Sequence, residues 1–243
     1  MDGTFLALVA AYLFAEFPLQ SLGDDRPFAF WPFVLHLVVV GVVTTAILGG
    51  WQPAIIAGVL VAHLVTEPLR RSPTLSRFAL AQAVHLAVLG GLAVLFPTAF
   101  AQGWAGWLTP VQLGYGLAGL TLAAGLILGV EVGGVVVGLG TKGLRAQIDD
   151  DMIDGLRGGS LYIGWLERAL VMLLVLINQP AGVGFVITAK SILRFSDAKD
   201  IKHRQASEYI IIGTFMSFGW GLAVALLTHW TIGHWLPETA PLP

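Results

Sequence analysis

Long apolar runs dominate this chain and constrain its fold more than any other feature. A membrane-spanning helix needs roughly 20 mainly apolar residues, and eight runs approach that length: 3–20, 28–50, 52–68, 78–97, 112–140, 161–178, 181–195 and 208–230. Of the 243 residues, 56% are hydrophobic and only 12% are charged, whereas soluble domains carry about 25% charged residues. A soluble fold could not bury this much apolar surface, so we predict an all-α, polytopic integral membrane helical bundle.

Two of these runs affect the number of crossings. The run at 181–195 is short, so it fits either a tilted span whose lysine and arginine reach the interface or a re-entrant hairpin with part of 161–178. The first run lacks the basic region that precedes a cleaved signal sequence, so we count it as a span. The sequence therefore predicts seven or eight transmembrane helices.

The basic residues gather on one side of this arrangement. All 13 Lys and Arg except Arg168, which lies inside a run, fall in or beside the loops after the first, third, fifth and seventh runs. The positive-inside rule assigns that side to the cytoplasm, so with eight spans both termini lie on the opposite side. The net charge of −2 is too small to suggest nucleic-acid binding, and the lack of cysteine excludes disulfides and thiolate sites.

The first four runs contain two copies of one pattern. Residues 9–20, VAAYLFAEFPLQ, and 59–70, VLVAHLVTEPLR, share Ala, then Tyr or His, Leu, Glu and Pro-Leu in the same order. The runs that follow share His-Leu-x-Val-x-Gly, within 34–41 and 83–90. Because both copies run in the same direction, we predict a parallel two-fold repeat about an axis along the membrane normal.

Polar side chains recur at matching depths in the two copies. Residues four apart share a helix face, so Tyr12, Glu16 and Gln20 form one stripe and His63 and Glu67 form its counterpart. At 1.5 Å per residue, these stripes reach the cytoplasmic third of the bilayer. The other polar residues that we expect inside the bundle are His36, Gln82, His85, Glu131, Glu167 and Arg168.

Three interpretations of this cluster are open. Imidazole and carboxylate from neighbouring helices are suitable ligands for Zn, Fe or Mn, and the candidate metal ligands are His36, His63, Glu67, His85 and Glu16. Without a metal, the same groups could relay protons or bind a polar headgroup. Polar residues of membrane bundles also hydrogen-bond across helices with a purely structural effect.

The remaining features favour simpler interpretations. The acidic residues Asp149, Asp150, Asp151 and Asp154 lack the spacing of a calcium loop, which favours a cytoplasmic linker. The glycines of 112–140 indicate close helix packing or a homo-oligomer face. The last group of basic residues predicts contact with anionic lipid in the bilayer; it comprises Lys190, Arg194, Lys199, Lys202 and Arg204.

Several of these residues resemble a bacterial family of multi-span membrane proteins catalogued as domain of unknown function 3307. The family's first span reads His-x-x-x-Asp-Phe-x-Leu-Gln, which Tyr12, Glu16, Phe17, Leu19 and Gln20 resemble. The family's other motifs resemble His36, His63 with Glu67, and Ala81-Gln82 with His85. Residues 164–195 and 206–218 are the closer match, and the resemblance covers most of the chain except about 98–159.

The resemblance implies a bacterial inner-membrane protein without assigning a reaction. Tyr12 and Ala81 replace the family's His and Asp, so two potential ligands are absent, which favours a non-enzymatic membrane subunit or a permeation protein for small solutes or protons. The alternatives are a metal-dependent membrane hydrolase and a membrane scaffold. The scaffold would act either alone or with a membrane partner protein. We expect three parts: a four-helix repeat at 1–97, a Gly-rich span with an acidic linker at 98–160, and a C-terminal part at 161–243.

Overall fold

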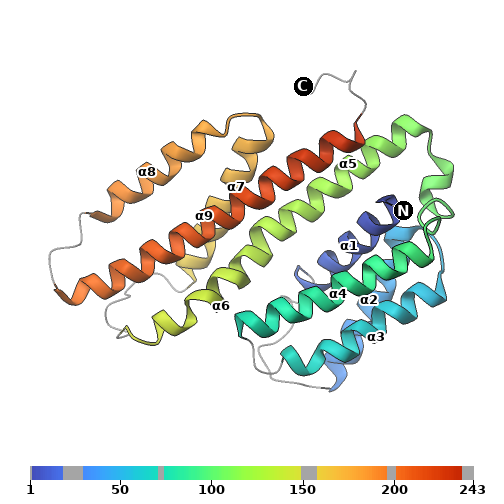
Figure 1. The fold of residues 1–243 in the computed structure, drawn as a ribbon, viewed down its shortest axis with the longest axis horizontal. Helices are drawn as coiled ribbons and strands as arrows, with labels where there is room; N and C mark the ends of the chain where they lie inside the picture. The colour runs from blue at the N-terminus through green and yellow to red at the C-terminus, as the bar shows by residue number, and fades with distance from the viewer. Residues whose placement is uncertain (1, 19–29, 71–73, 149–157, 196–200, 237–243) are drawn as a thin grey trace. The chain divides into compact units, whose positions relative to one another are not determined.

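A computed structural model describes residues 2–18, 30–70, 74–148, 158–195 and 201–236 (Figure 1). All regular secondary structure in the described part is helical, with no strand, which confirms the all-α prediction. Its first helices are α1 (Asp2–Glu16), α2 (Phe30–Leu48), α3 (Pro53–Arg70) and α4 (Leu75–Leu95), followed by the 3-10 turn η1 (Trp104–Trp107). Then come α5 (Pro110–Leu126), the π-helical turn η2 (Ile127–Val132), α6 (Gly133–Arg145), α7 (Gly159–Leu176), α8 (Ala181–Phe195) and α9 (Ile201–Trp235).

Five helical segments of the described chain are long and apolar enough to cross a membrane. They are Phe30–Leu48, Leu75–Leu95, Pro110–Arg145, Gly159–Leu176 and Ser207–Trp235. Three further apolar helices are shorter, namely Gly3–Glu16, Pro53–Leu69 and Ala181–Ile192. Several potential spans are therefore present, and the total of seven or eight crossings stays a prediction.

The chain divides into two compact units, which we call unit 1 and unit 2. Unit 1 comprises Met1–Ile127 with Trp230–Pro243, and unit 2 comprises Leu128–His229. One boundary falls within the helical segment Pro110–Arg145, at the π-helical turn η2, and the other lies near the end of α9. The sequence-based division at residues 97 and 160 follows loops instead, and it stays a prediction.

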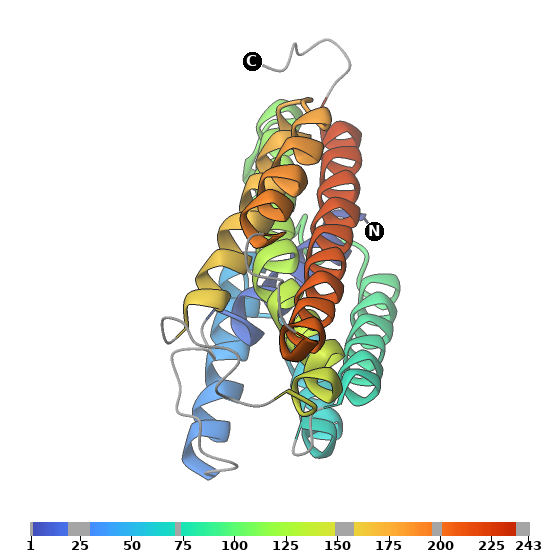
Figure 2. The same cartoon turned by 90° about the vertical axis from the view of Figure 1, so that its left-hand side faces the viewer.

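In unit 1, α1 is the central helix although it has only 15 residues. It contacts α2, α4 and α5, while α3 lies beside α4 in both views (Figures 1 and 2). Four of the almost fully buried α1 side chains are alanines, which let neighbouring helices approach closely; they are Ala7, Ala10, Ala11 and Ala15. This close packing brings polar side chains of α1, α2 and α3 together.

One end of unit 1 is held by contacts between loops. The Trp104 indole nitrogen donates to the Ala46 carbonyl at 2.6 Å, and the Gln52 amide donates to the Ala99 carbonyl at 2.8 Å. Gly49 has a φ of +77°, a left-handed conformation that favours glycine. A Cβ on Gly103 would lie 1.8 Å from the Leu48 carbonyl oxygen. The link between α2 and α3 therefore packs tightly against the loop after α4.

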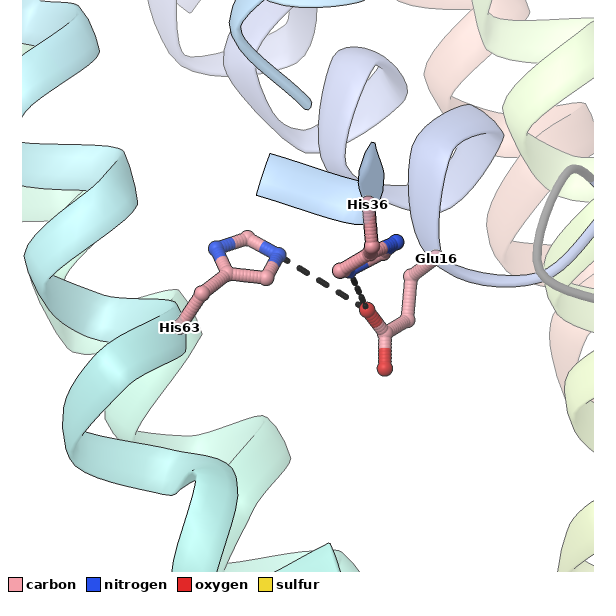
Figure 3. A group of neighbouring side chains, drawn as sticks. All are labelled: Glu16, His36 and His63. Carbon is pink, nitrogen blue, oxygen red and sulfur yellow. Dashed lines mark ion pairs between the residues drawn. The ribbon is translucent and has the colours of Figure 1, made fainter. Parts of the chain in front are cut away.

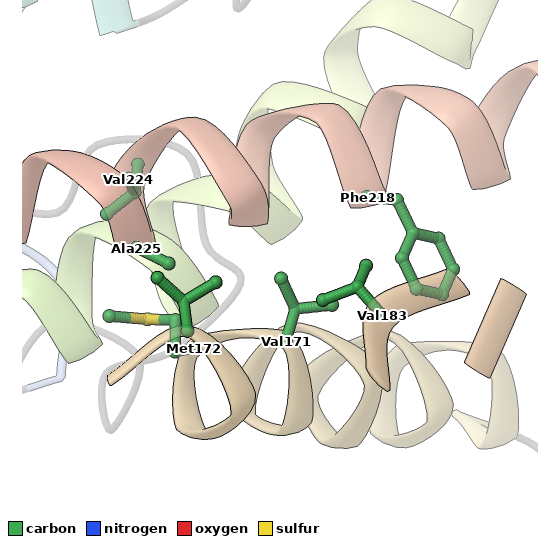
Figure 4. Close-up of a cluster of buried hydrophobic side chains, with 7 residues drawn as sticks. Val171, Met172, Val183, Phe218, Val224 and Ala225 are labelled. Atoms are coloured by element: carbon green, nitrogen blue, oxygen red, sulfur yellow. The ribbon is translucent and has the colours of Figure 1, made fainter. Parts of the chain in front are cut away.

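Unit 2 has its own apolar core between α7, α8 and α9 (Figure 4). Val171 and Met172 of α7 are completely buried, and Phe218 of α9 is 4% exposed. The other core members are Val175, Val183, Val224 and Ala225. An ion pair of 2.6 Å between Lys190 Nζ and a Glu167 carboxylate oxygen joins α8 to α7 beside this core.

Candidate metal centre

Three helices of unit 1 bring one carboxylate and two imidazoles together. Glu16 is the last residue of α1, His36 lies in the second turn of α2, and His63 lies in the middle of α3. Glu16 Oε2 is 3.1 Å from His36 Nε2 and 3.6 Å from His63 Nε2, so both rings approach the same oxygen (Figure 3). One ligand atom from each residue lies within 4.8 Å of the other two.

The two separations that involve Glu16 Oε2 suit a shared metal ion. Ligand atoms about 2.1 Å from a tetrahedral metal lie roughly 3.4 Å from one another. The two contacts to Glu16 Oε2, at 3.1 and 3.6 Å, bracket that value. Two neutral imidazoles and one carboxylate form a donor set that binds Zn²⁺, Fe²⁺ or Mn²⁺.

The backbone of α3 defines the tautomer of His63. His63 Nδ1 lies 2.9 Å from the Val59 carbonyl oxygen one turn earlier. A carbonyl can only accept, so in the neutral ring the hydrogen is on Nδ1 and the lone pair is on Nε2. Nε2 therefore directs its lone pair toward a carboxylate oxygen. A histidine that binds a metal commonly has this arrangement, with its second ring nitrogen donating to a backbone carbonyl.

The three side chains are largely buried, so a charged carboxylate among them is costly unless it is neutralised. The side chains of His63, His36 and Glu16 are 1%, 9% and 11% exposed. His36 Nε2 and His63 Nε2 are fully buried, and neither makes a hydrogen bond of acceptable geometry to the described residues. Glu16 also ends α1, where the helix dipole disfavours negative charge. A cation bound among these atoms would neutralise the carboxylate and satisfy both nitrogens.

A second layer of aromatic and polar side chains encloses the group. The His85 ring lies 4.6 Å from the His63 ring, and Tyr12 stacks on His85 with 4.5 Å between ring centroids. The Tyr12 hydroxyl donates to Gln82 Oε1 at 2.8 Å. His85 Nδ1 lies 2.9 Å from the Ala81 carbonyl oxygen, which repeats the arrangement of His63. Tyr12 and Gln82 therefore hold His85 beside the three candidate ligands.

The other predicted site residues lie elsewhere or outside the described residues. Glu67 lies one turn beyond His63 on α3, and neither it nor His85 belongs to the three-residue group. Glu131, Glu167 and Arg168 belong to unit 2. The positions outside the described residues are Gln20, Lys199 and the acidic residues Asp149, Asp150, Asp151 and Asp154.

Sequence analysis did not find the polar contacts of η2. Arg168 Nε donates to the Val130 carbonyl at 3.0 Å, and the Trp220 indole nitrogen donates to the Leu128 carbonyl at 2.9 Å. A π-helical turn alters the regular i→i+4 pattern, and such turns occur frequently at functional sites. The available signals were the glycine pair Gly133–Gly134 and an arginine inside an apolar run.

Comparison with known proteins gives no further guide to this group. No family model, curated protein or solved structure matches the chain. Its function therefore has to be inferred from the side chains themselves.

Proposed function

We propose that this chain is a multi-pass membrane protein that binds a divalent transition-metal ion through Glu16, His36 and His63. The observation that carries the proposal is the buried His63 Nε2, which lies 3.6 Å from Glu16 Oε2 while His63 Nδ1 lies 2.9 Å from the Val59 carbonyl oxygen. Two acceptors in contact repel each other unless a cation lies between them. A metal ion meets this need and also uses the buried nitrogen of His36.

A metal bound by three protein ligands keeps a coordination position for water or substrate. Bound water loses a proton more readily than free water, so such a centre can carry out hydrolysis. The surrounding helices are apolar, which suits a lipid-borne substrate. A metal-dependent membrane hydrolase is therefore the enzymatic form of this proposal.

The proposal is tested first by metal analysis of the purified protein. We expect about one equivalent of Zn, Fe or Mn per chain in a non-ionic detergent, because the three ligands form one group. His63→Ala removes a ligand and is expected to lose that metal. His229→Ala is the control, since it removes an imidazole outside the group. Protein that carries no metal after reconstitution with each of the three ions would overturn the proposal.

The second candidate function is permeation of protons or small solutes by a non-enzymatic membrane subunit. In that case the group of Glu16, His36 and His63 binds a proton in place of the metal. The 3.1 Å contact between Glu16 and His36 favours it, because this pair can hold and release a proton. In metal-free liposomes, Glu16→Gln should abolish proton-coupled flux while the protein remains folded. Absence of both metal and flux would leave a structural role in helix association.

Ring contacts within unit 1 support the proposed two-fold repeat. The repeat pairs Tyr12 with His63 and His36 with His85. The two-fold axis would therefore relate the His36–His63 ring pair to the Tyr12–His85 ring pair. Both pairs are in contact, with centroid separations of 5.4 and 4.5 Å. The proposed arrangement has seven or eight spans, with α1 and α3 among them and α8 as either an eighth span or part of a re-entrant hairpin.

The cellular setting is proposed on the same basis as the spans. The distribution of basic residues and the resemblance to the bacterial family favour the bacterial inner membrane. Anionic lipid at the basic group is part of this proposal. Of that group, Lys190 is paired with Glu167, and the side chains of Arg194, Lys202 and Arg204 lie outside what is described.

A further inference from the structure

Arg168 is a buried arginine in the middle of α7 that the proposed metal centre does not use. Its side chain is only 3% exposed. Nε donates to the Val130 carbonyl at 3.0 Å, and Nη1 donates to the Ser217 hydroxyl at 3.1 Å. These two bonds connect α7 to η2 and α9, and they use two of the five N–H groups of a guanidinium.

The charge of Arg168 has no carboxylate in contact among the described residues. Glu167 is adjacent in sequence, but its carboxylate binds Lys190 at 2.6 Å. Glu131 and Glu167 both act on Arg168 through space, and neither forms an ion pair with it. A buried charge without a direct ion pair is costly, so an external anion would stabilise this part of unit 2.

The unused side of the guanidinium lies close to the backbone of Gly134 on α6. A Cβ on Gly134 would lie 3.1 Å from Arg168 Nη2 and 3.8 Å from Trp165 Nε1. Neither nitrogen donates a hydrogen bond to a described residue. Two N–H donors from adjacent turns of α7 therefore border a position that any larger residue at 134 would partly fill.

We propose that Arg168 Nη2 and Trp165 Nε1 bind an oxyanion beside Gly134. An oxyanion supplies the negative charge that Arg168 lacks and offers at least two acceptor oxygens for the two donors. A lipid phosphate, a fatty-acid carboxylate and free phosphate share this chemistry. The site lies wholly within unit 2 and is independent of the metal proposed in unit 1.

The test compares Gly134→Ala with Gly138→Ala in a non-ionic maltoside detergent. Both variants add one methyl group to α6, but a Cβ on Gly138 has no atom within 4 Å. The probes are inorganic phosphate, phosphatidic acid and oleate, each titrated by calorimetry against the full chain. We expect saturable binding of at least one probe to the unmodified protein and to Gly138→Ala. Binding to Gly134→Ala should be weaker by about tenfold or more, because hydrogen bonds to a charged group are lost.

Two substitutions at the donors complete the test. Trp165→Phe removes one N–H while retaining an aromatic ring, and Arg168→Lys keeps the charge but loses the planar pair of donors. Each should weaken the same probe, whereas Arg145→Gln, at the end of α6, should not. Binding of phosphatidic acid or oleate alone identifies an amphiphile headgroup as the source, and binding of phosphate identifies a free anion. No binding of any probe, or equal binding by the two alanine variants, would overturn the proposal.

Discussion

Gly103→Ala is expected to lower the melting temperature of the detergent-purified protein by roughly 6–12 °C. The added Cβ would meet the Leu48 carbonyl oxygen at 1.8 Å and the Leu48 carbonyl carbon at 2.9 Å. Both are backbone atoms at the end of α2, so the loop after α4 has to move away. Overpacking costs about 1–3 kcal/mol. A contact this short should reach the upper end of that range, and each kcal/mol lowers Tm by roughly 2–4 °C in a chain of this size.

Gly50→Ala is the matched control for this substitution. It adds the same methyl group to the link between α2 and α3, but a Cβ at Gly50 has no atom within 4 Å. Its melting temperature should stay within about 2 °C of the unmodified protein, as for surface substitutions that change stability by less than about 0.5 kcal/mol. If the two variants have the same melting temperature, Gly103 is not in contact with the end of α2.

The helices of unit 1 could be predicted from sequence because apolar runs of this length have few alternatives. Helical spacing likewise identified Tyr12, Glu16, His63 and His85 as polar residues on shared faces. The sequence could not decide which acid would join the histidines, since Glu16 and Glu67 occupy matching positions in the two copies. The two helices end differently: α1 stops at Glu16, whereas α3 continues through Pro68 to Arg70.

The polar contacts of unit 2 could not be predicted because they depend on tertiary packing. The run at 112–140 has the composition of one continuous helix, and nothing local requires an i→i+5 turn at Ile127–Val132. Side chains from α7 and α9 bind two carbonyls of that turn. Those partners lie 38 and 92 residues away in sequence. Arg168 was recognisable as a polar residue within the bundle, whereas its acceptors became evident only from the fold.

The comparison of Glu16 with Glu67 also gives the most direct test of the proposed metal centre. Glu16→Gln keeps the size of the side chain but removes a charged ligand from the group of Glu16, His36 and His63. Loss of a partner that only orients a ligand weakens metal binding by about 10–100-fold. Loss of Glu16 itself should therefore raise the Kd for Zn²⁺ by about 100-fold or more, measured by competition with a chelator in detergent.

Glu67→Gln provides the comparison, because it makes the same chemical change at the matching position of the second copy. Glu67 lies outside the three-residue group and supplies no ligand atom, so its substitution should change the Kd for Zn²⁺ by about threefold at most. Melting temperatures of both variants, measured without metal, show whether either substitution acts by unfolding the bundle. Equal losses of affinity in two folded variants would mean that the acids share the metal and that the ligand set extends to the second copy. Unchanged affinity in Glu16→Gln would exclude Glu16 as a ligand, because a buried carboxylate bound to Zn²⁺ cannot be replaced by an amide without loss.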